Sequence, residues 1–375
     1  MKKLAIVHFH ALEQYPPVTN LIKYIEVHNS ANVEVEVFTA SPVLNQTRFH
    51  SPAVTIRRWT PPGESKTVVS RFYRYLVFYS QIFFALLKYR PTEVLYFETL
   101  SFLPVYVYRL FMKPLGKSPR IFCHYHEYMS TDEYENGMFL TRFINKLEKR
   151  NYTHMEWISH TNEDRMRLFK MDNKDFDFGN AYILPNYPPS NWQNTNKNSE
   201  SVLPIRIVLV GSIGMETMYI KEFAQWVESE NGRVVWDIYS FQKPDAILEY
   251  LSTINSKYIY FKGPVNYYDL PEVLKQYQVG VILYKGHIPN CVYIAPNKLF
   301  EYYACGLDTW FPVEMETSKD YVTNNVYPRI VAVDFRNMEK IDITRITEHS
   351  NLNFQKSTYY CEKVLDPLWK KLSMT

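Results

Sequence analysis

The sequence predicts an α/β protein built from two Rossmann-like, doubly wound domains. Short apolar segments alternate with helical patterns along most of the chain, as expected for parallel strands joined by crossover helices. The alternation stops once, between residues 188 and 204, where the chain is polar, rich in Asn and Ser, and bounded by proline. A chain of 375 residues is also too long for one typical core. We therefore predict a first domain over residues 1–187, a linker over 188–204 and a second domain over 205–350.

The first domain begins with a nearly continuous apolar strand over residues 4–10, which suits a parallel sheet buried on both faces. The following pattern is typical of the same sheet and its covering helices. Further strands are predicted at residues 33–39, 54–59, 93–98, 120–127, 156–161 and 181–186, with helices at 17–28, 66–89, 102–112, 138–152 and 162–170.

The second domain repeats this alternation without any repeat of residue identity. Strands are predicted at residues 205–211, 234–240, 258–262, 279–284 and 330–333, and helices at 216–230, 244–254, 269–277, within 296–307 and at 354–372. Ligands of such sheets bind beyond the carboxyl ends of the strands, so the residues that end each strand are the first candidates for a site.

Composition excludes several classes of protein. The net charge of +3 is too small to indicate nucleic-acid binding. The four cysteines show neither a CxxC nor a zinc-site spacing, which indicates reduced thiols. The first residues lead into a strand without a signal-peptide pattern, and no run approaches the roughly 20 apolar residues of a membrane span. These features predict a cytoplasmic protein.

The most informative motif is Pro-Asn-Lys-Leu-Phe-Glu-Tyr-Tyr-Ala-Cys-Gly-Leu, residues 296–307. Proline suits the first turn of a helix, and Gly306 suits its left-handed end. Asn297 and Lys298 then lie in the first turn, where free N–H groups and the helix dipole favour an anion. Glu301 lies one turn further on. The arrangement suits a nucleoside diphosphate, with Lys298 on the phosphates and Glu301 on vicinal sugar hydroxyls.

This motif resembles the nucleotide-sugar-binding segment of the GT-B glycosyltransferases, particularly the bacterial group 1 or GT4 family. In that family, the Glu that matches Glu301 holds the donor ribose and is the second of a pair eight residues apart. The first position of the pair is Tyr293 in this chain. The resemblance implies two domains that face a central cleft, with the nucleotide sugar on the second and the acceptor on the first. It also implies that a final helix, within residues 351–375, packs back on the first domain.

A second candidate donor segment is the turn Gly211-Ser-Ile-Gly214, which follows the first strand of the second domain. Such a turn lets a pyrophosphate approach backbone N–H groups. Family members carry an Arg where this chain has Ser212, so Lys298 and Lys285 are expected to meet the phosphate charge. The resemblance also places a strand-end glycine beside the base. The predicted donor site comprises Gly211, Ser212, Gly214, Gly263, Lys285, Asn297, Lys298, Leu299 and Glu301.

In the first domain, His124-Tyr-His126-Glu127 ends a strand. A His-Glu pair here resembles the family, in which a His contacts the reacting sugar. We predict catalytic roles for His126 as a polar contact, for Glu127 as its orienting group or a base, and for Lys298 at the leaving diphosphate. His124 and His10 are predicted acceptor contacts, with satisfied structural histidines as the alternative. His-x-His pairs also suit metals, but the family works without one, so no metal is predicted.

Residues 71–90 combine aromatic residues with four basic ones. The segment suits either a helix on a membrane surface, since acceptors in the family are often lipid-linked, or a helix buried against the sheet. It lacks a clean polar face, so we favour the buried helix. Peripheral contact with the inner face of a membrane is the other interpretation.

The resemblance implies transfer of a sugar from a UDP- or GDP-sugar to a hydroxyl of a glycan or lipid-linked acceptor, with retention of anomeric configuration, in surface-glycan biosynthesis. Two alternatives share the fold: a sugar-nucleotide epimerase, and a donor-binding protein without turnover, because Tyr293 and Ser212 replace expected donor contacts. A secreted solute-binding protein has a similar outline but requires a secretion signal.

Overall fold

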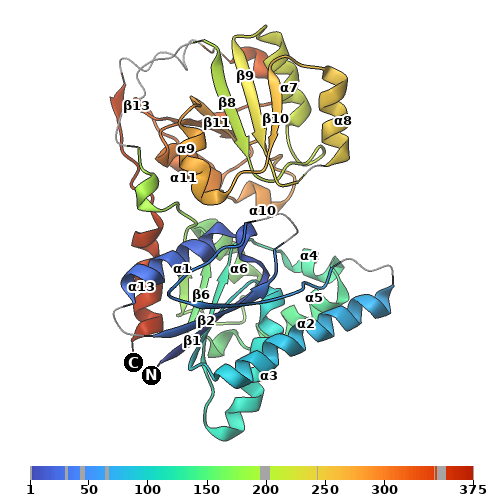
Figure 1. Ribbon diagram of the computed structural model, residues 1–375, viewed down its shortest axis with the longest axis vertical. Helices are drawn as coiled ribbons and strands as arrows, with labels where there is room; N and C mark the ends of the chain where they lie inside the picture. Colours follow the sequence, from blue (N-terminus) through green and yellow to red (C-terminus); the bar gives the residue numbers. More distant parts are fainter. Residues whose placement is uncertain are drawn as a thin grey trace. The chain divides into compact units, whose positions relative to one another are not determined.

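The computed structural model describes residues 2–29, 33–42, 47–63, 67–194, 203–242, 244–341, 343 and 352–374. Contacts between residues divide the chain into two compact units. Unit 1 contains Met1–Asn186 and Cys361–Thr375, and unit 2 contains Tyr187–Tyr360. The two units, each with its own sheet, are drawn in Figure 1. The prediction of two α/β domains built on parallel sheets is confirmed.

Unit 1 is built on a seven-stranded parallel sheet in the order β3-β2-β1-β4-β5-β6-β7. The strands are β1 Lys3–Ala11, β2 Glu34–Ala40, β3 Thr55–Trp59, β4 Glu93–Phe97, β5 Arg120–Tyr125, β6 Trp157–His160 and β7 Ala181–Ile183. The helices are α1 Pro16–His28, α2 Val68–Tyr89, α3 Phe102–Met112, α4 Thr131–Asn136, α5 Phe139–Lys149, α6 Glu163–Asp172 and α13 Cys361–Ser373.

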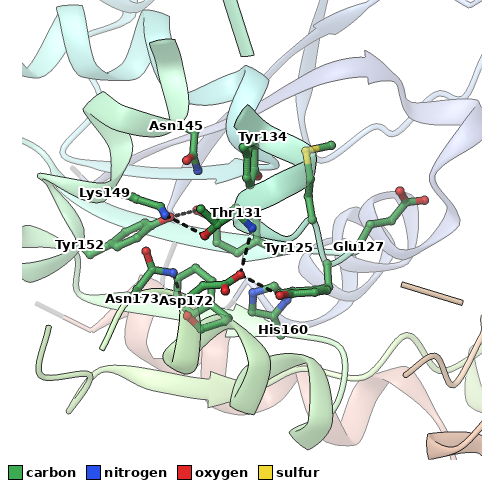
Figure 2. Close-up of a pocket in the computed structure, with 13 residues that line it drawn as sticks. Tyr125, Glu127, Thr131, Tyr134, Asn145, Lys149, Tyr152, His160, Asp172 and Asn173 are labelled. Carbon is green, nitrogen blue, oxygen red and sulfur yellow. Dashed lines mark hydrogen bonds between the residues drawn. The ribbon is translucent and has the colours of Figure 1, made fainter. Parts of the chain in front are cut away.

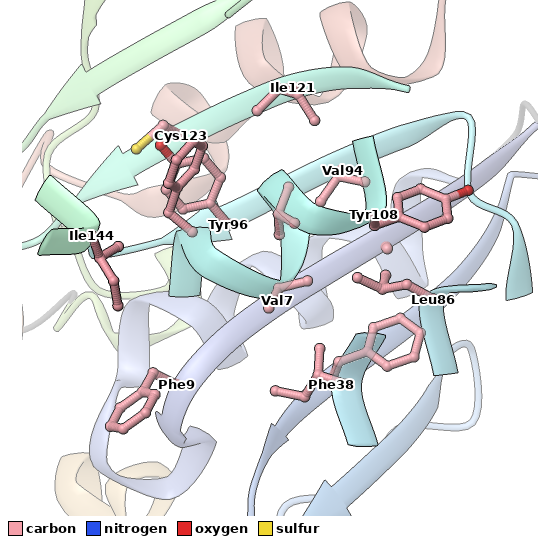
Figure 3. Close-up of a cluster of buried hydrophobic side chains, with 14 of the residues drawn as sticks. Val7, Phe9, Phe38, Leu86, Val94, Tyr96, Tyr108, Ile121, Cys123 and Ile144 are labelled. Atoms are coloured by element: carbon pink, nitrogen blue, oxygen red, sulfur yellow. The ribbon is translucent and has the colours of Figure 1, made fainter. Parts of the chain in front are cut away.

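Both faces of this sheet are buried, as the apolar first strand predicted. Alternate residues of β1 enter different cores: Ala5 and Val7 pack with α2, α3, α5 and α6, whereas Leu4 and Ile6 pack with α1 and α13. Figure 3 shows the first of these cores. Helix α13 packs against α1, where Trp369 Nε1 donates a hydrogen bond to the carbonyl of His28 at 3.2 Å. The predicted return of the last helix to the first domain is therefore confirmed.

Unit 2 is built on a six-stranded parallel sheet in the order β10-β9-β8-β11-β12-β14. Its strands are β8 Ile205–Val210, β9 Val234–Tyr239, β10 Ile259–Gly263, β11 Val279–Val281, β12 Asp308–Pro312 and β14 Ile330–Val333, and β13 Val326–Tyr327 pairs separately with β15 Asn353–Phe354. Its helices are α7 Ile220–Ser229, α8 Asp245–Ile254, α9 Leu270–Leu274, α10 Pro289–Val292 and α11 Asn297–Ala304.

In both sheets the strand order reverses beside the first strand, between β1 and β4 in unit 1 and between β8 and β11 in unit 2. Ligands of open α/β sheets bind at such switch points, beyond the carboxyl ends of the strands. Each unit therefore offers one expected ligand position.

Several predicted boundaries are wrong. The helix expected from residue 216 begins at Ile220, because the chain first makes an antiparallel bridge from Met218 to Tyr284. The helix expected from residue 354 begins at Cys361, since Asn353 and Phe354 form a short strand. Strand β12 was not predicted, because its five residues begin with a buried Asp and end with proline. Helix α4 was also missed, although Ser130 and Glu133 form a capping box at its start.

The helix predicted to lie buried against the sheet is only half buried. Helix α2 buries Phe78, Tyr79, Ile82, Leu86 and Tyr89, which lie between its middle and its C-terminal end. Its N-terminal half leaves Val68, Val69, Phe72, Tyr73 and Leu76 exposed. In the described residues, no helix is both long enough and apolar enough to span a bilayer.

Candidate functional site

The candidate site of unit 2 lies at the switch point between β8 and β11. Gly211 follows β8 with a φ of 122°, a value that side-chain-bearing residues rarely adopt. A β-carbon at Gly211 would lie 3.2 Å from Cε of Lys298, which comes from the start of α11. The glycine thus lets the lysine side chain lie across the end of β8. Two residues predicted from separate motifs are brought together here.

Lys298 pairs with the third predicted residue of this group. Its Nζ lies 3.1 Å from Oε2 of Glu301 on the same helix, and the Glu301 residue is 1% exposed. The other oxygen, Glu301 Oε1, is buried without a hydrogen-bond partner in the described structure. Buried polar atoms nearly always make a hydrogen bond. A buried carboxylate oxygen without one, next to a partly exposed lysine, therefore indicates a site where a hydroxyl group of a ligand can donate a hydrogen bond.

The start of α11 supplies further donors. Its N-cap residue Pro296 makes no side-chain capping bond, so the first turn is not closed by a side chain. Asn297 is half-buried at this end, whereas Leu299 is fully buried in the core. The tyrosine that follows Glu301 fixes the helix to the sheet, because the Val210 N–H donates to Tyr302 Oη at 2.9 Å.

The other predicted donor residues are spread along the same sheet edge. Lys285 Nζ lies 3.4 Å from Glu222 Oε1 and 5.3 Å from the centre of the Tyr219 ring, so its charge is already paired. Ser212 is exposed. Gly214 lies in the turn between β8 and α7. A β-carbon at this position would lie 2.5 Å from Thr217 Oγ1, so the turn has no room for a side chain. Gly263 ends β10 with a φ of 80° and open space around it.

Unit 1 gathers imidazoles at its own switch point, at the carboxyl ends of β1 and β5. The ring of His126 lies 4.7 Å from that of His124 and 6.4 Å from that of His8. The His10 ring stacks on Tyr15 at 5.2 Å, and Tyr15 lies 5.7 Å from His126. Cys123 and Tyr125 point to the opposite core, because successive side chains of a strand alternate between the faces of the sheet.

These imidazoles are neutral at physiological pH. Burial lowers the pKa of His124 to about 3 and lowers the pKa of His126 well below its usual range. Neutral imidazoles both donate and accept hydrogen bonds, which suits contacts with hydroxyl groups. Both ring nitrogens of His126 and Nε2 of His124 are buried without partners in the described structure. Glu127, in contrast, is exposed.

Sequence reasoning missed one residue of this group, Glu98. It follows β4 directly, and its Oε1 accepts hydrogen bonds from the backbone N–H groups of His126 at 2.6 Å and Glu127 at 3.3 Å. Burial, and then the charge of Glu127, raise the pKa of Glu98 to about 8. No feature of the sequence indicates these contacts, because Glu98 resembles the last position of an ordinary strand.

Unit 1 also contains a cavity of about 20 Å³, lined by Tyr125, His160 and Asn173 among others (Figure 2). Both ring nitrogens of His160 and Oδ1 of Asn173 are buried without partners in the described structure. The volume is that of about one water molecule, and a bridging water suits these atoms better than a substrate does.

Comparisons with known proteins match the whole chain in structure. No protein-family model matches the sequence, and no curated protein matches it significantly. The lipopolysaccharide outer core galactosyltransferase WaaB is 13% identical, with a TM-score of 0.60 over 98% of this chain and 99% of that one. HepE from Anabaena, solved with UDP and glucose, is 10% identical with a TM-score of 0.68 over all of both chains. The chain has the GT-B fold.

The GT-B fold extends beyond transferases. A putative UDP-N-acetylglucosamine 2-epimerase from Listeria monocytogenes is also similar, at 10% identity and a TM-score of 0.56 over 98% of this chain and 94% of that one. The fold predicted from the motif at residues 296–307 is therefore confirmed, while the activity is to be argued from the residues themselves.

Proposed function

We propose that this protein is a glycosyltransferase that moves a sugar from a nucleoside-diphosphate donor to a hydroxyl of a glycan or lipid-linked acceptor. The observation that carries the proposal is the group formed by Gly211, Lys298 and Glu301 at the β8–β11 switch point. Gly211 leaves its backbone open to close approach, Lys298 supplies a cation, and Glu301 supplies a buried carboxylate oxygen without a hydrogen-bond partner in the described structure. The similarity to GT-B transferases supports this assignment.

In this proposal, Glu301 Oε1 accepts a hydrogen bond from a ribose hydroxyl of the donor. Lys298 and the first-turn N–H groups of α11 contact the diphosphate. As the glycosidic bond breaks, negative charge grows on the leaving diphosphate, and preorganised donors stabilise it. The neutral imidazoles of unit 1, His126 and His10, would contact hydroxyl groups of the sugar or acceptor. Retention of configuration, a role in surface-glycan synthesis and independence from a bound metal belong to the proposal through the resemblance of the motif.

The proposal is tested by turnover of a panel of UDP- and GDP-sugars with and without hydroxyl acceptors. We expect glycosylated product and released nucleoside diphosphate only when an acceptor is present, with retention visible by NMR of the product. Lys298→Ala should lower turnover by at least a factor of 100, which corresponds to about 2.7 kcal/mol of lost transition-state stabilisation. Isomerised or hydrolysed donor without acceptor would instead indicate the epimerase alternative. Binding without any turnover would indicate a donor-binding protein.

A cytoplasmic location is part of the same proposal. It is supported by the cysteines, none of which forms a disulfide in the structure.

We further propose that unit 1 contacts an anionic membrane surface. Thirteen large apolar side chains are exposed on α2, on α5 and its preceding residue, and around α3: Val68, Val69, Phe72, Tyr73, Leu76, Phe84, Val107, Leu110, Phe111, Leu115, Met138, Phe139 and Phe143. Contacts between Phe83 and Phe111 join α2 to α3, which lie side by side in Figure 1.

Charge identifies the kind of partner. Residues 65–92 and 99–126 contain no Asp or Glu, yet they contain nine Lys and Arg. Exposed cations such as Arg71, Lys113 and Lys117 therefore alternate with exposed aromatic and aliphatic side chains. Apolar groups that enter a bilayer interface, together with cations that attract anionic headgroups, are the two components of peripheral membrane binding.

Vesicle sedimentation tests this contact. We expect binding to vesicles that contain anionic phospholipid, weaker binding at high salt, and none to purely zwitterionic vesicles. Phe72→Ser with Leu76→Ser should abolish the binding, whereas Phe241→Ser, which changes an exposed aromatic residue of unit 2, should leave it unchanged. Equal binding by both variants, or no binding by the wild type, would reject the proposal.

A further inference from the structure

Glu98 occupies the β1–β4 switch point with an unusual backbone conformation. Its φ of 61° is combined with a ψ of 152°. Arg90 and Asn255 also have positive φ, but their ψ values of 60° and 44° place them in the ordinary left-handed region at helix ends. Glu98 lies outside that region, in conformations that are almost confined to glycine. Such strain persists where surrounding contacts hold it, and it often marks functional sites.

Three of the hydrogen bonds of Glu98 lead to one segment, whereas its carbonyl accepts from the N–H of Ser101 at 3.0 Å. Its carboxyl Oε1 accepts from the N–H groups of His126 and Glu127, at 2.6 and 3.3 Å. Its own backbone N–H donates to the carbonyl of His124 at 3.2 Å. One hydrogen bond thus joins Glu98 to the end of β5, and two join its carboxyl group to the turn that follows.

That turn carries the imidazole of His126, whose surroundings are mostly aromatic rings and the side chain of Asn186. The His126 ring stacks on Phe97 at 5.2 Å with an interplanar angle of 6°, and it meets the His124 ring edge-on at 4.7 Å. Both of its ring nitrogens lack partners in the described structure. The direction of these nitrogens therefore depends on the backbone of the turn together with the side chain of Asn186. Arg165 Nη1 also holds this backbone, because it donates to the His126 carbonyl at 2.5 Å.

We propose that Glu98 is a positioning residue, whose carboxyl group fixes the turn at residues 126–127 and thereby sets the orientation of the His126 imidazole. That this imidazole meets a sugar or acceptor rests on the proposed function. The attachment of the turn to Glu98 is independent of the proposed function.

The protonation of Glu98 gives this role a pH signature. Burial, and then the charge of Glu127, raise the pKa of Glu98 to about 8. At pH 7 the carboxyl group is therefore mostly neutral and accepts both N–H bonds through one oxygen. Ionisation at higher pH brings a negative charge next to Glu127 and changes the environment of the turn. The titratable or charged groups that face this region are Tyr15, His8, His10, His124, His126, Glu127, Glu148 and Arg165.

NMR of the histidine rings tests the attachment without any substrate. His126 itself stays neutral above pH 6, because burial lowers its pKa well below the usual range. Its ring signals, assigned by their loss in His126→Asn, should nevertheless shift with a midpoint near pH 8, and this step should be absent in Glu98→Gln. The Gln side chain keeps an oxygen that accepts both N–H bonds, so the fold is retained. A wild type without the step, or a step that persists in Glu98→Gln, would overturn the proposal.

Glu93→Gln is the matched control. Glu93 is a buried carboxyl group at the start of β4, the strand that ends just before Glu98, and it pairs with Lys2 and Arg120. Its replacement should lower the Tm yet leave the pH step of His126 intact. Loss of the step in Glu93→Gln as well would show that it reports general loosening of the sheet, which would also overturn the proposal.

Glu98→Gly tests the consequence for turnover. Glycine relieves the backbone strain but removes the carboxyl group, so the Tm should change by only a few degrees while kcat falls at least tenfold. Arg90→Gly relieves a positive φ away from the site and should keep the wild-type kcat. A wild-type kcat in Glu98→Gly would overturn the positioning role. If no transfer occurs with any donor while the pH step is present, the proposed function fails and the attachment of the turn stands.

Discussion

The side chain of Lys298 lies directly over the backbone of Gly211, so that a β-carbon on the glycine would be 3.2 Å from the lysine Cε. Gly211→Ala should therefore displace Lys298 and strain a φ of 122°. We expect at least a tenfold loss of nucleotide affinity and a destabilisation of about 1–3 kcal/mol. Calorimetric titration and urea denaturation measure the two effects.

Gly116→Ala is the control for strain alone. Gly116 has a φ of 67°, with no atom within 4 Å of the added carbon. The Gly116→Ala variant should be less stable than the wild type but should bind nucleotide with the same affinity. Equal nucleotide affinity in Gly211→Ala and the wild type would contradict the described position of Lys298.

Lys298 and Glu301 should be coupled in stability. The 3.1 Å contact between their side chains places the Lys298 cation next to a buried carboxylate. Lys298→Met leaves that carboxylate uncompensated and should cost about 3 kcal/mol, whereas Lys298→Met with Glu301→Gln should recover part of the loss. A double-mutant cycle by urea denaturation gives the coupling energy. Strictly additive effects would refute the pairing.

Gly280 should tolerate no side chain. It lies in β11, and a β-carbon would be 2.2 Å from the ring of Tyr302. The same Tyr302 accepts the N–H bond from Val210, so a shift of the ring also breaks the link between α11 and β8. Gly280→Ala should destabilise unit 2 by about 3 kcal/mol or more. A Tm within one degree of the wild type would contradict this packing.

Stability should be greatest at about pH 7, because the buried groups of unit 1 change stability in opposite directions. Burial lowers the pKa of His124 and His160 to about 3, so below pH 6.5 the unfolded chain binds more protons and stability falls as the pH falls. Burial raises the pKa of Glu148 to about 7 and of Glu98 to about 8, so stability also falls as the pH rises through those values. Thermal unfolding across pH 5–9 measures the maximum, and Glu98→Gln should flatten its alkaline side. Stability that increases steadily from pH 7 to pH 9 would refute these shifts.

The sequence was most informative where function depends on local spacing. Lys298 and Glu301 are three residues apart on one helix, so their proximity follows from helical geometry. The strand-end glycine at position 211 was identified by its place after an apolar strand, and the fold places it against the same lysine. The doubly wound order followed from the alternation of elements.

Other features depend on tertiary contacts and were not predictable. The role of Glu98 depends on its φ and ψ and on two N–H groups almost thirty residues away. The ion pair of Lys285 with Glu222 of α7 is also a tertiary feature that the sequence around Lys285 does not reveal. The exposed half of α2 is rich in aliphatic and aromatic residues like its buried half, so only the contacts of the fold distinguish them.

The central claim is that α11 and the end of β8 form the donor site, and calorimetric titration with UDP, GDP and their sugars tests it most directly. We predict that one nucleotide class binds the wild type, and that Glu301→Gln and Lys298→Ala each weaken this binding at least tenfold. Glu272→Gln, a change on an exposed carboxylate of unit 2, should bind like the wild type. Absence of binding to every nucleotide, or equal binding by Glu301→Gln and the wild type, would contradict the donor site.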